Sequence, residues 1–222
     1  MAKLTWHNNG DKRYETGVDR GVLFLPDQTG EYKTGYAWNG LTAVNESPSG
    51  AEPTKQYADN AVYLTLVSAE EFGATIEAYT WPDKFSICDG SAEPSEGVYV
   101  GQQPRQNFAL AYRTKIGDDV AGMNKGYKLH IIYNALAAPS ERAYSTVNES
   151  PEAATFSWEL STTPVRFDDD SSTATIIIDS TKVPAAKLEA FEDIIYGTAS
   201  VEPSLPSPSE VIAHFKATTP TP

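Results

Sequence analysis

The sequence predicts a mainly β protein, a β-sandwich or barrel of two packed sheets flanked by one α-helix, with a long loop and terminal arms. Three observations predict this class. Much of the 222-residue chain falls into short runs in which apolar and polar residues alternate, as they do in half-buried strands. Gly, Pro, Asn and Asp separate these runs as turn signals. Hydrophobic residues make up 40% of the chain, which is enough to fill the core of one large β domain.

The alternation is clearest in residues 156–161. Phe156, Trp158 and Leu160 lie on one face of the predicted strand, and small or acidic side chains lie on the other. One face of this strand is therefore expected in the core and the other in water. Alternation or a β-branched run predicts the remaining strands, over Tyr36 to Asn45, Ala74 to Trp81, 108–113, 127–133 and 174–179.

The flanking helix is predicted over residues 184–196. Pro184 suits the first helical position, and Gly197 suits the residue just past the end. Charged residues on one side of this segment oppose an apolar stripe, so the helix is expected to lie on a sheet. The stripe consists of Leu188, Phe191 and Ile195.

An internal repeat suggests where the long loop lies. Val44 to Pro48 has the same five residues as Val147 to Pro151, and the strand after each copy is similar. The first copy carries an insertion, residues 49–73, which is expected to start as an exposed loop over about residues 46–62. A capping-box spacing at Ser68 predicts about one helical turn, which Gly73 ends.

Two regions follow from these patterns. Residues 1–200 are expected to form the β domain. Residues 201–222 are rich in proline and are expected to form an arm or linker, in which Glu210 to Lys216 has the pattern of a short helix or strand.

Composition excludes several classes of function. The chain has 17 Lys and Arg against 30 Asp and Glu, a net charge of −13, and proteins that grip nucleic acid instead carry cations for the phosphates. No apolar stretch has the length of a membrane span or the character of a secretory signal. The chain is therefore expected to be made in a cytoplasm.

Residues with catalytic potential are scattered. His7, His130 and His214 are far apart, and the single cysteine, Cys88, has no basic neighbour to activate it. Three adjacent carboxylates, Asp168 to Asp170, have the character of a solvated turn, because calcium loops space their ligands at alternate positions. The sequence thus predicts no enzyme and no catalytic, cofactor-binding or metal-binding residues.

Two alternatives stay open at this point. Glu77 and Glu159 occupy comparable places in the repeat, and paired carboxylates can serve glycoside hydrolysis. The aromatic content of 11% is also compatible with a carbohydrate-binding β-sandwich of a phage tail tip or a cell surface. Of these two, carbohydrate binding is the stronger, because nothing else in the sequence suggests a sugar-cleaving site.

Several ordered blocks together resemble the major tail proteins, or tail tube proteins, of long, non-contractile-tailed bacteriophages. The resemblance runs from about residue 10 to residue 200 and so covers most of the chain. The blocks that carry it are Tyr14 to Leu23, Ala37 to Thr54, Phe72 to Pro82, Cys88 to Ala92, Gly101 to Gln103, Gly126 to His130, Pro139 to Tyr144, Phe156 to Val165 and Ile178 to Val183.

The resemblance implies a structural protein of the virion with a tail-tube-like β fold. In this family six copies form a ring, and stacked rings form a tube through which the genome leaves. The implied partners are other copies of the chain, a tape-measure protein, and the tail terminator and distal tail proteins. DNA would pass through the lumen without specific binding.

Two sets of residues are expected to carry this function. Glu77 and Glu159, with the small residues Ser157 and Ser161, are expected to line the channel and repel phosphates. The start of the insertion is expected to reach a neighbouring ring or subunit and to become ordered there. The residues assigned to this inter-ring contact are Ser49, Gly50, Glu52, Pro53, Lys55, Tyr57 and Asp59.

Overall fold

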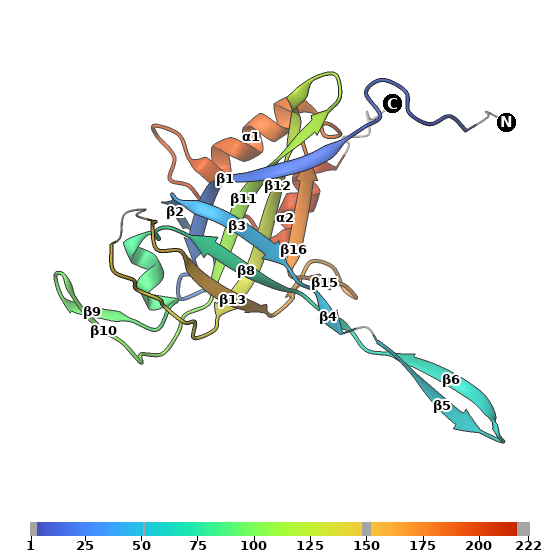
Figure 1. The fold of residues 1–222 in the computed structure, drawn as a ribbon, viewed down its shortest axis with the longest axis horizontal. Helices are drawn as coiled ribbons and strands as arrows, with labels where there is room; N and C mark the ends of the chain where they lie inside the picture. Colours follow the sequence, from blue (N-terminus) through green and yellow to red (C-terminus); the bar gives the residue numbers. More distant parts are fainter. Residues whose placement is uncertain (1–3, 51, 148–151, 217–222) are drawn as a thin grey trace.

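A computed structural model describes residues 4–50, 52–147 and 152–216 and confirms a mainly β chain (Figure 1). Eight strands form one large sheet: β1 (Tyr14–Leu25), β2 (Thr34–Trp38), β3 (Leu41–Glu46), β8 (Gly73–Ala78), β11 (Phe108–Asp118), β12 (Gly122–Ala137), β13 (Phe156–Thr162) and β16 (Thr175–Asp179). Four pairs of shorter strands lie outside it: β4 (Ser49–Gly50) with β7 (Glu70–Glu71), β5 (Pro53–Ala58) with β6 (Ala61–Val67), β9 (Ala92–Ser95) with β10 (Val98–Val100), and β14 (Val165–Arg166) with β15 (Ser172–Thr173). The helices are η1 (Asp83–Ile87), α1 (Ala185–Tyr196) and α2 (Pro208–Phe215).

The large sheet is continuous, whereas the sequence suggests two separate packed sheets. Its strand order is β2-β1-β11-β12-β13-β8-β3, and β16 also pairs with β12. Every pairing is antiparallel. Strand β12 therefore joins two parts of one sheet, because its middle pairs with β16 and its last residues pair with β13.

The change of partner occurs at Asn134. Residues Lys128–Ile132 pair with β16, residues Ala135–Ala137 pair with β13, and Asn134 between them has a φ of 49°. Asparagine tolerates this left-handed conformation better than most residues. The Asn107 amide donates to Asn134 Oδ1 at 2.7 Å, and Asn134 Nδ2 donates to the Thr163 carbonyl at 3.2 Å. These contacts hold a bulge that bends the sheet.

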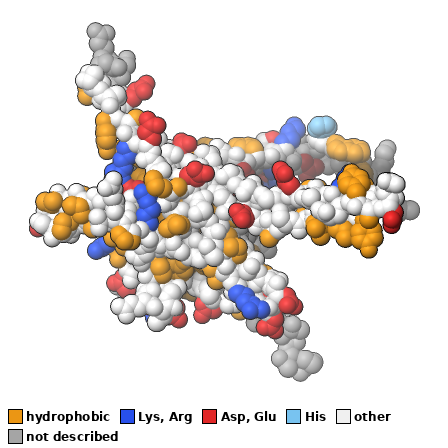
Figure 2. Space-filling model, turned by 90° about the horizontal axis from the view of Figure 1, so that it is seen from below, with side chains coloured by type: hydrophobic (Ala, Val, Ile, Leu, Met, Phe, Trp, Pro, Cys, Tyr) orange, Lys and Arg blue, Asp and Glu red, His pale blue; other side chains and the backbone are white. Residues whose placement is uncertain are grey.

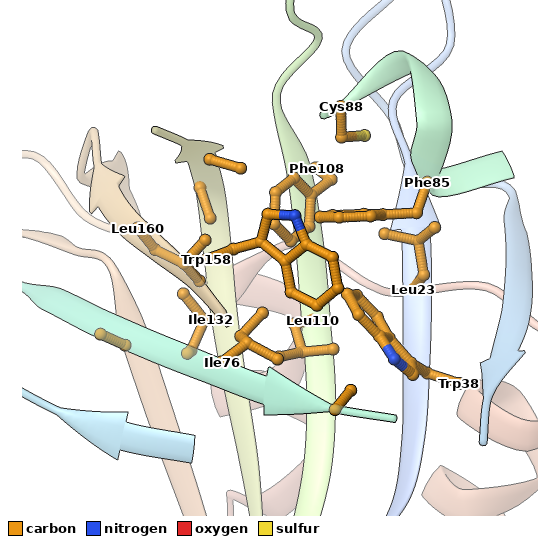
Figure 3. Packing of buried hydrophobic residues seen from close by; sticks show 14 of the residues in the cluster. Leu23, Trp38, Ile76, Phe85, Cys88, Phe108, Leu110, Ile132, Trp158 and Leu160 are labelled. Atoms are coloured by element: carbon orange, nitrogen blue, oxygen red, sulfur yellow. The ribbon is translucent and has the colours of Figure 1, made fainter. Parts of the chain in front are cut away.

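The bent sheet encloses one core and supports a second. Trp158, on β13, lies in the first core with side chains from β1, β2, β8, β11 and β12 (Figure 3). Its ring centroid lies 5.2 Å from that of Phe85 and 5.9 Å from that of Trp38, in edge-on contacts that aromatic rings favour. Each indole N–H has a partner: Trp158 donates to Asp89 Oδ1 at 3.1 Å, and Trp38 to the Thr80 carbonyl at 2.9 Å.

The second core lies between the opposite face of the sheet and the two helices. Helix α1 starts one residue later than predicted, because Pro184 is the N-cap and not the first helical residue. It ends at Tyr196, and Gly197, whose φ is 73°, follows it as the sequence predicts. Its stripe of Leu188, Phe191 and Ile195 is buried against the sheet, which confirms the predicted face. Because strands β11 and β12 carry a core on each face, their central residues are apolar on both faces.

The proline-rich end differs from the expected arm or linker. Leu205 is buried and forms a bridge with Tyr32, and Val211 of α2 is buried in the second core. Helix α2 starts with a capping box in which the Ser207 backbone N–H donates to Glu210 Oε2 at 2.8 Å. Residues 201–216 are therefore part of the β domain, and the remainder of the expected arm lies outside the described residues.

The insertion also differs from expectation. It forms an extended hairpin of β5 and β6, with β4 and β7 paired at its root, instead of a loop. The helical turn predicted at Ser68 is absent from the described residues there, because Glu70–Glu71 form strand β7. The expected exposure is confirmed, since every described side chain of β4 to β7 is exposed.

We predict that Phe191→Ala destabilises the protein by about 3–5 kcal/mol, because the ring is fully buried and packs against Phe215. Denaturant unfolding followed by tryptophan fluorescence measures the loss. Glu189→Ala, on the exposed side of the same helix, is the matched control and should change the free energy of unfolding by less than about 0.5 kcal/mol. A loss below about 1 kcal/mol for Phe191→Ala would contradict the assigned packing.

Candidate assembly surfaces

The residues expected to line a channel come together on one face of the sheet. In the antiparallel pair β8–β13, Ser157 lies opposite Glu77 and Glu159 lies opposite Thr75. Residues directly opposite in such a pair project from the same face. Glu77 and Glu159 are therefore diagonal neighbours, and Ser161 follows on the same side. We call this surface the acidic face: Thr75, Glu77, Ser157, Glu159 and Ser161.

The chemistry of the acidic face is that of a hydrated negative surface. Its two carboxylates form no ion pair with Lys, Arg or His side chains of the described residues. The Asn45 amide donates a long hydrogen bond of 3.3 Å to Glu77 Oε1. Ser157, Glu159 and Ser161 are exposed, whereas Trp158 and the other residues between them face the core. Whether this face lines a channel stays a prediction.

The residues expected to make an inter-ring contact lie on the hairpin. Ser49 and Gly50 form β4 at its root; Glu52, Pro53, Lys55 and Tyr57 lie in or beside β5; and Asp59 lies in the turn. We call residues 49–71 the arm. Figure 1 shows the arm extending away from the rest of the chain.

Backbone geometry at two places shapes the arm. Asp59 and Asn60 have φ values of 51° and 61°, the signature of the two-residue turns that twist correctly for a hairpin. Gly50 has a φ of 82°, and a Cβ there would lie 2.7 Å from the Ala69 carbonyl oxygen. Only glycine therefore fits where the root strands approach each other.

Strand β6 carries most of the exposed apolar side chains of the arm, and none of its residues is among those predicted to make the inter-ring contact. Tyr63 and Leu66 are 72% and 56% exposed, and Tyr57 on β5 is 70% exposed. Figure 2 shows hydrophobic side chains gathered on the arm, at the right of the view. The run Ala61–Val67 is among the longest apolar stretches of the chain, which was the available signal for this surface.

A hydrogen-bonded cluster holds the root of the arm to the sheet. Glu46, the last residue of β3 before the arm, accepts from Tyr112 Oη at 2.6 Å, and its Oε1 lies 3.1 Å from His130 Nδ1. The His130 and Tyr112 rings are stacked at 4.8 Å, and His130 Nε2 lies 3.0 Å from Thr114 Oγ1. Contact with His130 and the Tyr112 hydrogen bond lower the pKa of Glu46, although burial opposes them.

A cleft of about 330 Å³ lies near the opposite end of β8. Trp81, Tyr99, Asp83 and Arg142 line it together with three hydroxyl side chains. The Arg142 guanidinium lies 5.0 Å from the centre of the Trp81 ring and also bonds to Asp89, which anchors the Trp158 indole. Two aromatic rings beside charged and hydroxyl groups are an arrangement that can hold a small polar ligand.

The other residues with catalytic or metal-binding potential, Cys88 and Asp168 to Asp170, have surroundings typical of structural residues. Burial raises the pKa of the Cys88 thiol to about 12, so this thiol stays protonated at neutral pH. Asp168 Oδ1 accepts from the backbone N–H groups of Asp170 and Ser171 in a turn. In residues 4–50, 52–147 and 152–216, no three His, Cys, Asp or Glu side chains are grouped as metal ligands. None of the helices described is long and apolar enough to cross a membrane.

Comparisons with known proteins give only distant structural similarity. No protein-family model and no curated protein matches the sequence. A chain from the extended sheath–tube complex of an extracellular contractile injection system, PVC, aligns with a TM-score of 0.32 and 13% identity, over 72% of this chain and 88% of that one. The tube-terminating cap of the anti-feeding prophage aligns with a TM-score of 0.33 and 10% identity, over 81% and 96%.

A third similar structure is the sheath/tube terminator of the PVC injection system in its extended state. It has a TM-score of 0.31 and 12% identity, over 74% of this chain and 97% of that one. TM-scores of this size do not establish a shared function, and the proposals below rest on the residues of this chain.

We predict that the Glu46 cluster makes stability depend on acid pH. Because the pKa of Glu46 is lowered in the folded state, its contribution is present above the ordinary value of 4.5 and is lost as the pH falls through the folded value. The stability advantage of the wild type over Glu46→Gln should therefore shrink as the pH falls from 5 to 3. Denaturant unfolding at each pH measures this. A parallel pair of pH profiles would contradict the assignment, and Glu52→Gln on the exposed arm is the control.

Proposed function

We propose that this protein is the structural subunit of a phage tail tube, which forms stacked hexameric rings around an acidic channel for genome passage. The proposal combines the resemblance carried by the sequence blocks with the surfaces described above. It assigns the chain no catalytic role.

The arm is the observation that carries the proposal. A two-stranded hairpin is at best marginally stable alone in water, and this one exposes Tyr57 on β5 and five large apolar side chains on β6. Nothing in the described chain covers them, so a partner is needed to bury them. In the proposed tube the partner is another copy of the chain, and the arm makes the inter-ring contact.

The acidic face supports the proposed channel for genome passage. Carboxylates and short hydroxyl side chains repel phosphate and offer DNA no cation to bind. Six copies in a ring would repeat Glu77 and Glu159 around the channel. The tape-measure protein would occupy this channel during assembly, and the tail terminator and distal tail proteins would cover the tube ends. The chain would be made in the host cytoplasm and act in the virion.

A second candidate function is carbohydrate binding, and the cleft beside Trp81 and Tyr99 is the observation that favours it. The exposed Tyr99 ring and the half-buried Trp81 ring, with nearby carboxylate, guanidinium and hydroxyl groups, suit a sugar. A binder of this kind would stay small in solution and be retained on a sugar column. Tyr99→Ala would then abolish retention without changing the oligomeric state.

We predict sixfold rings or tubes when the purified protein is concentrated or when intact tails are examined. Head-to-tail contacts close a ring when the rotation between neighbours fits. Electron microscopy of cross-sections measures the symmetry. A different symmetry in the tail, or a monomer that binds a sugar column, would contradict the proposed function.

We predict that removing the hairpin leaves a folded chain that does not elongate. Replacing residues 53–67 by a short Gly-Ser link should change the free energy of unfolding little, because no described side chain of the hairpin is buried. Circular dichroism tests the fold, and sedimentation with microscopy tests assembly. Leu64→Ser/Leu66→Ser should have the same effect on assembly, and Gln56→Ala on the neighbouring strand should have none. Normal tubes from the shortened chain would exclude the arm as the inter-ring contact.

We predict that Glu77→Lys/Glu159→Lys tubes assemble but release DNA slowly. The effect should be largest at low salt, because screening lengths fall from about 30 Å at 0.01 M to about 8 Å at 0.15 M. Single-particle ejection assays measure the rate. Glu189→Lys/Asp193→Lys on the exposed side of α1 makes the same change in net charge and is the matched control. An unchanged rate, or equal slowing by both variants, would contradict a channel position for the acidic face.

A further inference from the structure

One edge of the large sheet lies open beside an apolar groove. Among the strands of the described chain, β16 pairs only with β12, so its other edge has no strand partner. The groove next to this edge lies between β16 and α2 and has a volume of about 530 Å³. Ile177 and Ile212, which line it, are 47% and 40% exposed. An open edge with apolar surroundings is a site for strand addition.

The two edge strands of the large sheet, β2 and β3, each lie against another part of the chain. Tyr32, just before β2, forms a bridge to Leu205, and a Cβ at Gly35 on β2 would lie 3.1 Å from Pro203. Strand β3 approaches β1 so closely that a methyl group at Gly21 would collide with Leu41. Beside the outer edge of β16, the described residues instead leave an apolar groove.

Strand β6 of the arm has the composition that this edge would accept. Its seven residues, Ala61–Val67, carry no charge and are apolar on both faces, apart from Thr65. Strands buried on both faces have such continuous apolar runs, whereas a hairpin with a face in water alternates. Only one edge of β6 is used, by β5, so the other is free among the described strands.

We propose that β6 of one copy adds to the open edge of β16 in a neighbouring copy, along the groove beside α2. This inference rests on the proposed function and names the surface that receives the arm. The occupant is a second copy because the arm extends away from its own domain (Figure 1).

Both faces of the joined strands would then find apolar neighbours. Ile176 and Ile178 of β16 pack toward the second core, and Ile177 projects from the other face. The charged residues that line the groove are Asp179, Lys182 and Lys216. Lys182 pairs with Asp179 at 3.5 Å, so Lys216 is the cation that Asp59, in the turn at the tip of the arm, would meet. Strand β5 suits the edge less well, because Lys55 lies within it.

Disulfide crosslinking between two separately labelled copies tests this pairing. One copy carries Ile177→Cys and a size tag; the other carries one cysteine at each position from 62 to 66 in turn. The two are co-assembled into tubes and oxidised, so a tagged mixed dimer must join different copies. Cys88 is fully buried, which keeps the background low. Ala190→Cys, exposed on α1, replaces Ile177→Cys as the matched control.

The expected result is mixed dimers at alternate arm positions and their loss at the positions between, because a paired strand presents successive side chains to opposite faces. Unassembled protein and the Ala190→Cys control should give none. Thr175→Cys, two residues along the same face of β16, should give the same alternation displaced along the arm, and it replaces Ile177→Cys if that variant does not assemble.

Two results would overturn the inference while leaving the proposed function intact: normal tubes without any mixed dimer, or dimers at every arm position without alternation. Crosslinking that appears only after removal of residues 217–222 would assign the groove to the chain's own terminus and would also overturn it. Failure of the wild type to form tubes would overturn the proposed function, and this inference with it.

Discussion

Strand β12 can hold two partners along one edge because its backbone bends at Asn134. Before the bend the strand pairs with β16 under the helices, and after it the strand pairs with β13 around Trp158. Because β16 and β13 occupy successive parts of the same edge, neither pairs with the other. The bend thereby closes the sheet around the aromatic core, directs the acidic face outward and leaves the far edge of β16 without a strand partner.

Patterns among neighbouring residues were sufficient to predict helix α1 and the buried side of strand β13. Helix α1 has Pro184 before it, Gly197 after it and one apolar stripe, so its limits and its buried face followed from spacing alone. The alternation around Trp158 likewise predicted which side of β13 is buried. The repeat predicted that Glu77 and Glu159 are comparable, and the pairing of β8 with β13 brings both onto one face.

Features that depend on distant partners were not predictable in this way. The left-handed Asn134 looks like any polar residue in a strand, so a continuous bent sheet could not be told from two sheets. Leu205 and Val211 lie in a proline-rich segment, and only their burial against Tyr32 and α1 reveals that this segment belongs to the domain. The polar first strand of the arm has the composition of a loop, so the sequence predicts a loop there. The Asp59-Asn60 turn and the apolar run after it contained the hairpin signal.

An uncharged, exposed β-strand such as Ala61–Val67 is also an aggregation hazard, since identical copies can pair with one another in the wrong way. The net charge of −13 opposes this, because similarly charged chains repel one another over a distance set by the salt concentration. Random encounters between free copies must overcome that repulsion for little contact area. In the proposed tube, a growing end that presents an edge and an apolar groove would compensate for it. For the proposed tube, the composition and the arm together would favour slow nucleation followed by rapid growth, with ionic strength controlling the threshold concentration.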